Sequence, residues 1–147
     1  MSLADWHKRG ALHKHAPGAQ EIAALLAVAD RDLADAGIRG VSADGRFRAA
    51  YNAVLSVATV ALHASGYRTP GHMAGHHART LQSLALTLGV EAALVDQLDL
   101  FRKKRNVSTY DMAGAISEEE VSALLHIARD LRKRTEAWLR STHPELT

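Results

Sequence analysis

The sequence contains no cysteine, which excludes disulfides, thiolate metal sites and a cysteine nucleophile. No apolar run reaches the roughly 18 residues needed to cross a bilayer, so a membrane association is not expected. The first residues lack a basic region followed by an apolar core, and no secretory signal is expected. Neither a P-loop nor a Gly-x-Ser-x-Gly nucleophile elbow occurs. Together these absences favour a cytoplasmic location.

The composition is that of one globular domain. The chain has 147 residues, of which 47% are hydrophobic and 23% charged. The net charge of +2 is uninformative, but the basic residues are unevenly placed. Such clusters can hold phosphate backbones, although a solvated helix face is the more common outcome for either one alone. The two clusters are the run Arg102-Lys103-Lys104-Arg105 and the group Arg129, Arg132, Lys133 and Arg134.

Apolar residues recur at three- and four-residue steps through nearly the whole chain, which predicts amphipathic helices. Proline and two glycines predict a loop over residues 66–71. The sequence Ser117-Glu118-Glu119-Glu120 is a capping box that predicts the start of the last helix. The expected helices lie between Pro17 and Gly37, between Ser42 or Asp44 and Gly66, over about residues 74–88, from Glu91 past Phe101, and after Ser117.

No segment alternates apolar and polar residues as a half-buried strand does, so the predicted fold class is all-α. Short connections between long helices favour antiparallel neighbours. We therefore expect an antiparallel up-and-down bundle of four to five helices. Residues 1–16 are expected to form an N-terminal arm or short helix, residues 17–141 the bundle, and residues 142–147 a C-terminal tail.

Arg105 continues the buried stripe of the fourth helix. Leu98 and Phe101 form the last part of this stripe, and Arg105 comes four residues after Phe101. The arginine should therefore lie on the same face and point inward. An unpaired buried charge costs several kcal/mol, so the guanidinium needs a partner. An internal ion pair with Asp99 or Asp111 would supply one. Alternatively, Arg105 lines a pocket or dimer cleft and binds phosphate.

The segment Arg105-Asn106-x-x-x-Tyr110, at the end of the penultimate long helix, resembles the signature of the HEPN domains (higher eukaryotes and prokaryotes nucleotide-binding). Gly66-Tyr67-Arg68 followed by Gly75-His76-His77 also resembles stand-alone HEPN proteins of actinobacterial type. The resemblance covers roughly residues 19–138. It implies a helical bundle that forms a homodimer, with two copies of the motif across a shared cleft.

Many HEPN proteins resemble metal-independent ribonucleases, in which a motif histidine helps to deprotonate the ribose 2′-OH and the arginine steadies the phosphate. Other members bind nucleotides, or act with a minimal nucleotidyltransferase or an antitoxin. Here Tyr110 stands where the ribonucleases have histidine. A phenol titrates near about pH 10 and is a poor general base at neutral pH. The motif therefore favours binding over catalysis, with Arg105 and Tyr110 as the candidate catalytic pair if cleavage occurs.

The chain also contains nine histidines, some of them closely spaced. His72 and His76 have a spacing that can place two imidazoles on one metal ion, but no acidic third ligand is near them in the sequence. We therefore expect no metal site and no cofactor. His63 is expected to be half-buried and hydrogen-bonded. His76, His77 or His126 could supply through space the base that the motif lacks.

The leading hypothesis is a HEPN-type dimer that binds RNA or a nucleotide phosphate in a toxin–antitoxin or defence setting. Arg105 would grip the phosphate, and the basic run would add electrostatic attraction. The rival hypothesis is an interaction module without a ligand, or the partner subunit of a nucleotidyltransferase. Besides Arg105 and Tyr110, the candidate binding residues are Arg102, Lys103, Lys104 and Asn106, with Asp111, His76 and His77 as structural residues near the motif.

Overall fold

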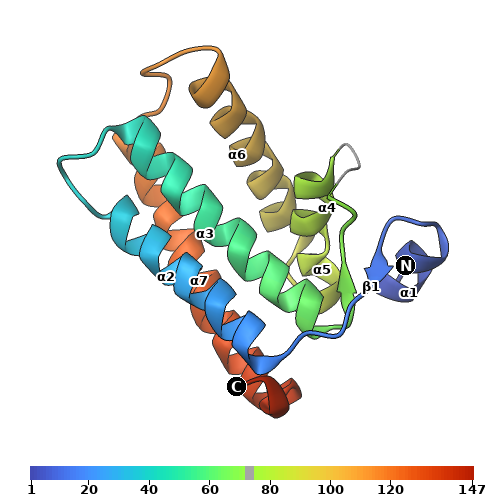
Figure 1. Cartoon of the computed structure of the whole chain (residues 1–147). Coiled ribbons are helices and arrows are strands. Elements are labelled where there is room, and N and C mark those ends of the chain that lie inside the picture. The colour runs from blue at the N-terminus through green and yellow to red at the C-terminus, as the bar shows by residue number, and fades with distance from the viewer. Residues whose placement is uncertain (72–74) are drawn as a thin grey trace.

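The chain is mostly helical, which agrees with the all-α prediction (Figure 1). The computed structural model describes residues 1–71 and 75–147, with Tyr110 described by its backbone alone. The elements, in chain order, are α1 Leu3–Lys8, β1 His13–Lys14, α2 Ala19–Ala36, α3 Ala43–Ala64, β2 Tyr67–Arg68, α4 His76–Gln82, α5 Leu84–Thr87, α6 Ala92–Tyr110, α7 Glu118–Thr142 and the 3-10 turn η1 Pro144–Leu146.

Three long helices, α2, α3 and α7, form the centre of the bundle (Figure 1). Ile22 at the start of α2 packs with Val60 and Leu139 near the ends of α3 and α7, so α2 is antiparallel to both. Arg46 and Glu118, in the first turns of α3 and α7, are joined by an ion pair of 2.5 Å. Helices α3 and α7 are therefore parallel neighbours. The antiparallel prediction is wrong for this pair, because β2, α4, α5 and α6 separate the two helices in the chain and no short loop joins them.

Helix α6 lies against α3 and carries the sequence motif. The rings of Phe47 and Phe101 meet edge-on with their centroids 5.6 Å apart. The backbone N–H of Gly114, just after α6, donates to a carboxylate oxygen of Asp44 at 2.8 Å. Because this bond joins the end of α6 to the start of α3, the two helices run in opposite directions, as expected for this pair.

The helix starts follow local capping chemistry. Ser42 accepts a hydrogen bond from the Gly45 backbone N–H at 3.0 Å, so Ser42 rather than Asp44 caps α3. Ser117 and Glu120 form both hydrogen bonds of the predicted capping box. These two starts agree with the sequence analysis because each depends only on residues a few positions apart.

The predicted third helix is divided. Helix α4 begins at His76 and ends at Gln82, and α5 covers only Leu84–Thr87. Between them the fully buried Ser83 donates its hydroxyl to the Thr80 carbonyl at 2.6 Å. Hydrogen bonds from a side chain to the nearby backbone compete with the hydrogen bonds that would continue the helix. The pattern of apolar residues does not predict such bonds. The expected start at about residue 74 lies outside the described residues.

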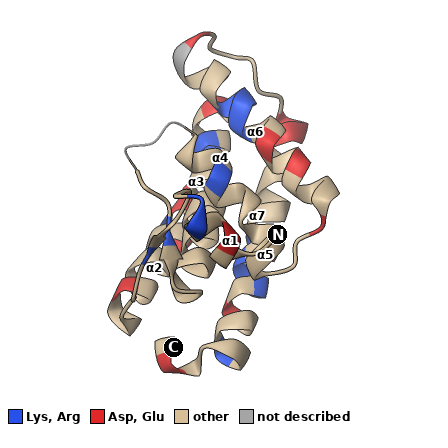
Figure 2. Cartoon of the chain, turned by 90° about the vertical axis from the view of Figure 1, so that its right-hand side faces the viewer, with Lys and Arg blue, Asp and Glu red and all other residues tan. Residues whose placement is uncertain are grey.

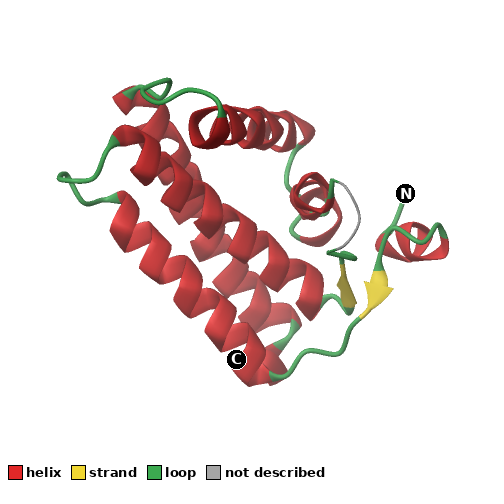
Figure 3. Ribbon diagram, turned by 45° about the horizontal axis from the view of Figure 1, so that its top comes forward, coloured by secondary structure: helices red, strands yellow, loops and turns green. Residues whose placement is uncertain are grey.

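The N-terminal arm meets the bundle through β1, while α1 stands to the side of the long helices (Figure 3). Strand β1 pairs antiparallel with β2, with His13 opposite Arg68. Leu12, immediately before β1, is 1% exposed. The loop predicted over residues 66–71 thus contains a short strand, and the prediction missed it because two paired residues give no alternating pattern.

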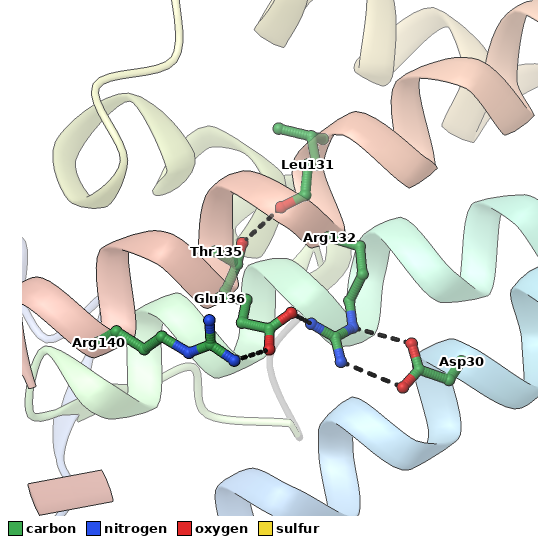
Figure 4. Close-up of polar contacts among 6 residues, drawn as sticks. All are labelled: Asp30, Leu131, Arg132, Thr135, Glu136 and Arg140. Carbon is green, nitrogen blue, oxygen red and sulfur yellow. Dashed lines mark hydrogen bonds and ion pairs between the residues drawn. The ribbon is translucent and has the colours of Figure 1, made fainter. Parts of the chain in front are cut away.

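Helix α7 is tied to α2 by a polar network (Figure 4). The guanidinium of Arg132 donates to both carboxylate oxygens of Asp30, at 2.8 and 3.1 Å, and also to Glu136, which accepts from Arg140. Arg132, in the second basic cluster, is therefore a link between helices. Thr135 is buried and donates to the Leu131 carbonyl.

The C-terminal tail continues this contact, since Leu146 of η1 packs on the cluster formed by α2, α3 and α7. Within the described part of the chain, no helix combines the length and the apolar character needed to span a bilayer.

Candidate functional site

Arg105 lies on the inward side of α6, as its place in the stripe predicts. Leu98 and Phe101, on the same stripe, are 1% and 9% exposed. The guanidinium carbon of Arg105 lies 5.5 Å from the centroid of the Tyr51 ring on α3. This distance is within the range of a cation–π contact. The stripe therefore brings a half-buried positive charge against an aromatic face of α3.

No carboxylate among the described side chains pairs with Arg105. Its one polar side-chain contact there is a donated hydrogen bond of 3.2 Å to the Asn106 amide oxygen. The Nε–H of Arg105 is buried and has no acceptor within the described residues. The internal ion pair considered from the sequence is thus absent: Asp99 binds other cations, and Asp111 is exposed at the end of α6.

The other three cations of the basic run are paired. Arg102 and Lys103 both contact Asp99, at 2.9 and 3.3 Å. Lys104 forms an ion pair with Glu120 in the capping box of α7. These contacts hold the pKa of the Asp99 and Glu120 carboxyls below their usual values, mainly through the hydrogen bonds that the cations donate. Arg105 differs from them in lacking an acidic partner among the described residues.

Tyr51 lies between the motif helix and α4. The centroids of the Tyr51 and His77 rings are 6.4 Å apart, and His76 stacks edge-on against His77 at 4.4 Å. Burial raises the pKa of Tyr51 to about 12, although Arg105 and Arg102 oppose this effect. We call Tyr51, His76, His77, Arg102 and Arg105 the Tyr51 cluster.

The Tyr51 cluster keeps His77 uncharged at neutral pH. Burial lowers the pKa of His77, and the charges of His76, Arg105 and Arg102 lower it further. The cluster thus combines two guanidinium groups with a neutral imidazole. Figure 2 shows basic positions on both α4 and α6, together with the acidic positions of α6.

Polar atoms without partners concentrate on the helices that meet here. Buried atoms with no hydrogen-bond partner among the described residues occur on α3, α4 and α6, which contact one another. A buried polar atom without a partner costs about 1–3 kcal/mol, so such a group gains when a ligand supplies the partner. These atoms are Arg48 Nε, Tyr51 OH, Arg79 Nη1, Arg105 Nε and Thr109 Oγ1; Asp44 Oδ1, at the start of α3, is the sixth.

The remaining predicted residues are not all brought together. His76 and His77 join the Tyr51 cluster, whereas His126 is exposed on α7. His72 lies outside the described residues, as does the side chain of Tyr110. Sequence reasoning missed Tyr51, because its place in an apolar helix stripe marked it as a core residue.

A second group of polar side chains lies at the other end of α3. His63 is half-buried and hydrogen-bonded, as expected, and its partner is Glu21 at 2.8 Å. The same Glu21 oxygen lies 2.7 Å from the Nε2 atom of His15. Among the described residues, His15, Glu21 and His63 form a group whose side chains could hold a metal ion. Their spacing of 6 and 42 residues carries no sequence signal.

Comparison with known proteins finds no relative of this chain. No protein-family model matches the chain, and no curated protein or solved structure resembles it at a significant level.

Proposed function

We propose that the chain is a HEPN-type domain that binds the phosphate of RNA or of a nucleotide at the Tyr51 cluster. The observation that carries the proposal is the Arg105 guanidinium, which is half-buried and has no carboxylate partner among the described residues. A phosphate oxygen is the acceptor that a guanidinium binds best after a carboxylate. The other three cations of the basic run have acidic partners, so Arg105 is the cation of this run with the most to gain from an anionic ligand.

The residues around Arg105 restrain its guanidinium and add positive charge, and both effects favour phosphate binding. Its contact with the Tyr51 ring and its hydrogen bond to Asn106 limit the positions of the guanidinium, which lowers the entropy lost on binding. Arg102 adds a second positive charge, partly offset by Asp99. Lys103 and Lys104 contribute less than the sequence suggests, because both are engaged with carboxylates.

Cleavage of RNA would require a general base, and His77 is the best candidate in the described residues. Its lowered pKa leaves the ring neutral and able to accept a proton from a ribose 2′-OH. This assignment replaces the motif histidine of HEPN ribonucleases with one from α4. It accounts for a ribonuclease without requiring Tyr110 to ionise.

The test is a titration of labelled single-stranded RNA and of mononucleotides with the wild type and with Arg105→Gln. We expect Arg105→Gln to lose roughly 10- to 100-fold in affinity, because a hydrogen bond to a charged group is worth about 1.5–3 kcal/mol. Wild-type affinity should also fall as salt is raised.

The matched control is Lys103→Gln, which removes one positive charge from the same helix at a site where the side chain is 64% exposed. It should change affinity far less than Arg105→Gln. Equal affinities of the wild type and Arg105→Gln would reject the phosphate role. Metal-independent RNA cleavage that is lost in His77→Gln would extend the proposal to an enzyme.

A homodimer is part of the same proposal, and exposed apolar residues of α6 support it. Leu100 and Val107 are seven residues apart and therefore share a helix face; their exposures are 64% and 41%. Met112, just past the helix, is 61% exposed. These exposed apolar side chains on the motif helix fit a second copy of the chain, or the antitoxin or nucleotidyltransferase subunit that the HEPN resemblance implies.

Light scattering coupled to gel filtration tests the dimer. We expect the wild type to elute with twice the mass of the chain, and the double variant Leu100→Glu/Val107→Glu to elute as a monomer, because each glutamate would place an unpaired charge in the interface. Ile38→Glu, at a 54% exposed loop position, is the control and should remain dimeric. A monomeric wild type would argue against self-association and favour a different partner.

A further inference from the structure

Three side chains from different parts of the chain converge at the end of the bundle away from the motif. Glu21 Oε2 lies 2.7 Å from His15 Nε2 and 2.8 Å from His63 Nδ1. The two imidazole rings also touch, with centroids 4.5 Å apart. All three candidate ligand atoms lie within 4.8 Å of one another. The group therefore offers two nitrogens and one carboxylate oxygen toward one point.

The fold places these residues independently of one another. His15 follows β1, and its backbone N–H donates to the Gly66 carbonyl at 2.9 Å, just beyond the end of α3. Glu21 lies in the first turn of α2, and His63 in the last turn of α3. The side chains of His15, Glu21 and His63 are 24%, 37% and 18% exposed. They are shielded by the fold but open to an ion from solvent.

The donor set suits a divalent transition-metal ion. Two imidazoles and one carboxylate are the ligands of many zinc sites, in which three protein ligands leave a fourth position open. Ligand atoms at about 2.0–2.1 Å from a tetrahedral ion lie roughly 3.3 Å apart. The Glu21 oxygen would therefore move about half an ångström from each ring nitrogen to admit the ion. The two ring nitrogens, which lie within 4.8 Å of each other, would take a similar separation.

We propose that His15, Glu21 and His63 bind one divalent transition-metal ion, with Zn²⁺ as the preferred occupant. The ion would join the N-terminal arm to the start of α2 and the end of α3. It leaves one coordination position for water or for an external ligand. This site is separate from the Tyr51 cluster, so it does not depend on the phosphate-binding proposal.

The experiment titrates Zn²⁺ into the full-length protein after removal of metal with a chelator, using a chromophoric competitor to measure affinity. We expect the wild type to bind one Zn²⁺ ion per chain with high affinity. Glu21→Gln and His15→Ala should each weaken Zn²⁺ binding by more than about 100-fold. Loss of a residue that only hydrogen-bonds to a metal ligand costs roughly 10- to 100-fold. Co²⁺ in place of Zn²⁺ should give the visible absorption of a four-coordinate site in the wild type.

The control is His126→Ala, because His126 is an exposed histidine of α7 outside the group. It should bind Zn²⁺ like the wild type, and circular dichroism should show all variants folded. The alternative is a carboxylate that merely accepts hydrogen bonds from two histidines. It predicts no tight equivalent in the wild type, or equal Zn²⁺ affinity in the wild type and Glu21→Gln, and either result overturns the proposal.

Discussion

Replacing Phe101 with alanine is expected to lower the free energy of unfolding by about 3–5 kcal/mol, the usual cost of deleting a buried phenyl ring. Phe101 is 9% exposed and meets Phe47 edge-on, and this contact is the main aromatic link between α6 and α3 in the described residues. Removal of the ring leaves a cavity and also forfeits the aromatic pair itself. Urea unfolding followed by circular dichroism measures the change.

The same variant should weaken RNA binding, because α6 carries Arg105 and Phe101 holds this helix against Tyr51. Ile38→Ala is the matched control: Ile38 is apolar but 54% exposed, and its loss should change stability by less than about 0.5 kcal/mol. If Phe101→Ala cost no more than Ile38→Ala, the Phe101 ring would not hold α6 against α3.

Leu12→Ala is expected to release the N-terminal arm at a cost of about 2–5 kcal/mol. Leu12 is 1% exposed, although it lies in a segment with only two paired strand residues. The short β1–β2 pairing is too small to hold the arm alone, since an isolated hairpin is marginal in water. The burial of one leucine therefore decides whether the arm stays docked.

Hydrogen exchange of the His15 backbone amide reports this release, because that N–H is bonded to the Gly66 carbonyl when the arm is docked. Exchange in Leu12→Ala should become much faster while amides of α3 stay protected. Lys8→Ala, an exposed change in α1, is the control and should leave the His15 amide protected. Unchanged protection in Leu12→Ala would mean that the strands and His15 contacts hold the arm without the leucine.

The candidate site was predictable in part. The apolar stripe of α6 predicted that Arg105 points inward, and the contact with Tyr51 agrees. The stripe could not identify what Arg105 meets, because Tyr51 lies 54 positions earlier in the chain. Nor could it show that Asp99 is taken by Arg102 and Lys103, which leaves Arg105 without that carboxylate.

The sequence by itself determined the helical class and most helix starts and ends, because periodicity and capping act over three or four residues. Ser117 with Glu120 is an example. Tertiary structure decided the parallel pairing of α3 with α7, the break at Ser83 and the docking of the arm. It also brought His15 and His63 onto one oxygen of Glu21. These features depend on packing between segments that are distant in the chain. The spacing of side chains along one helix does not identify which residues of another helix they contact.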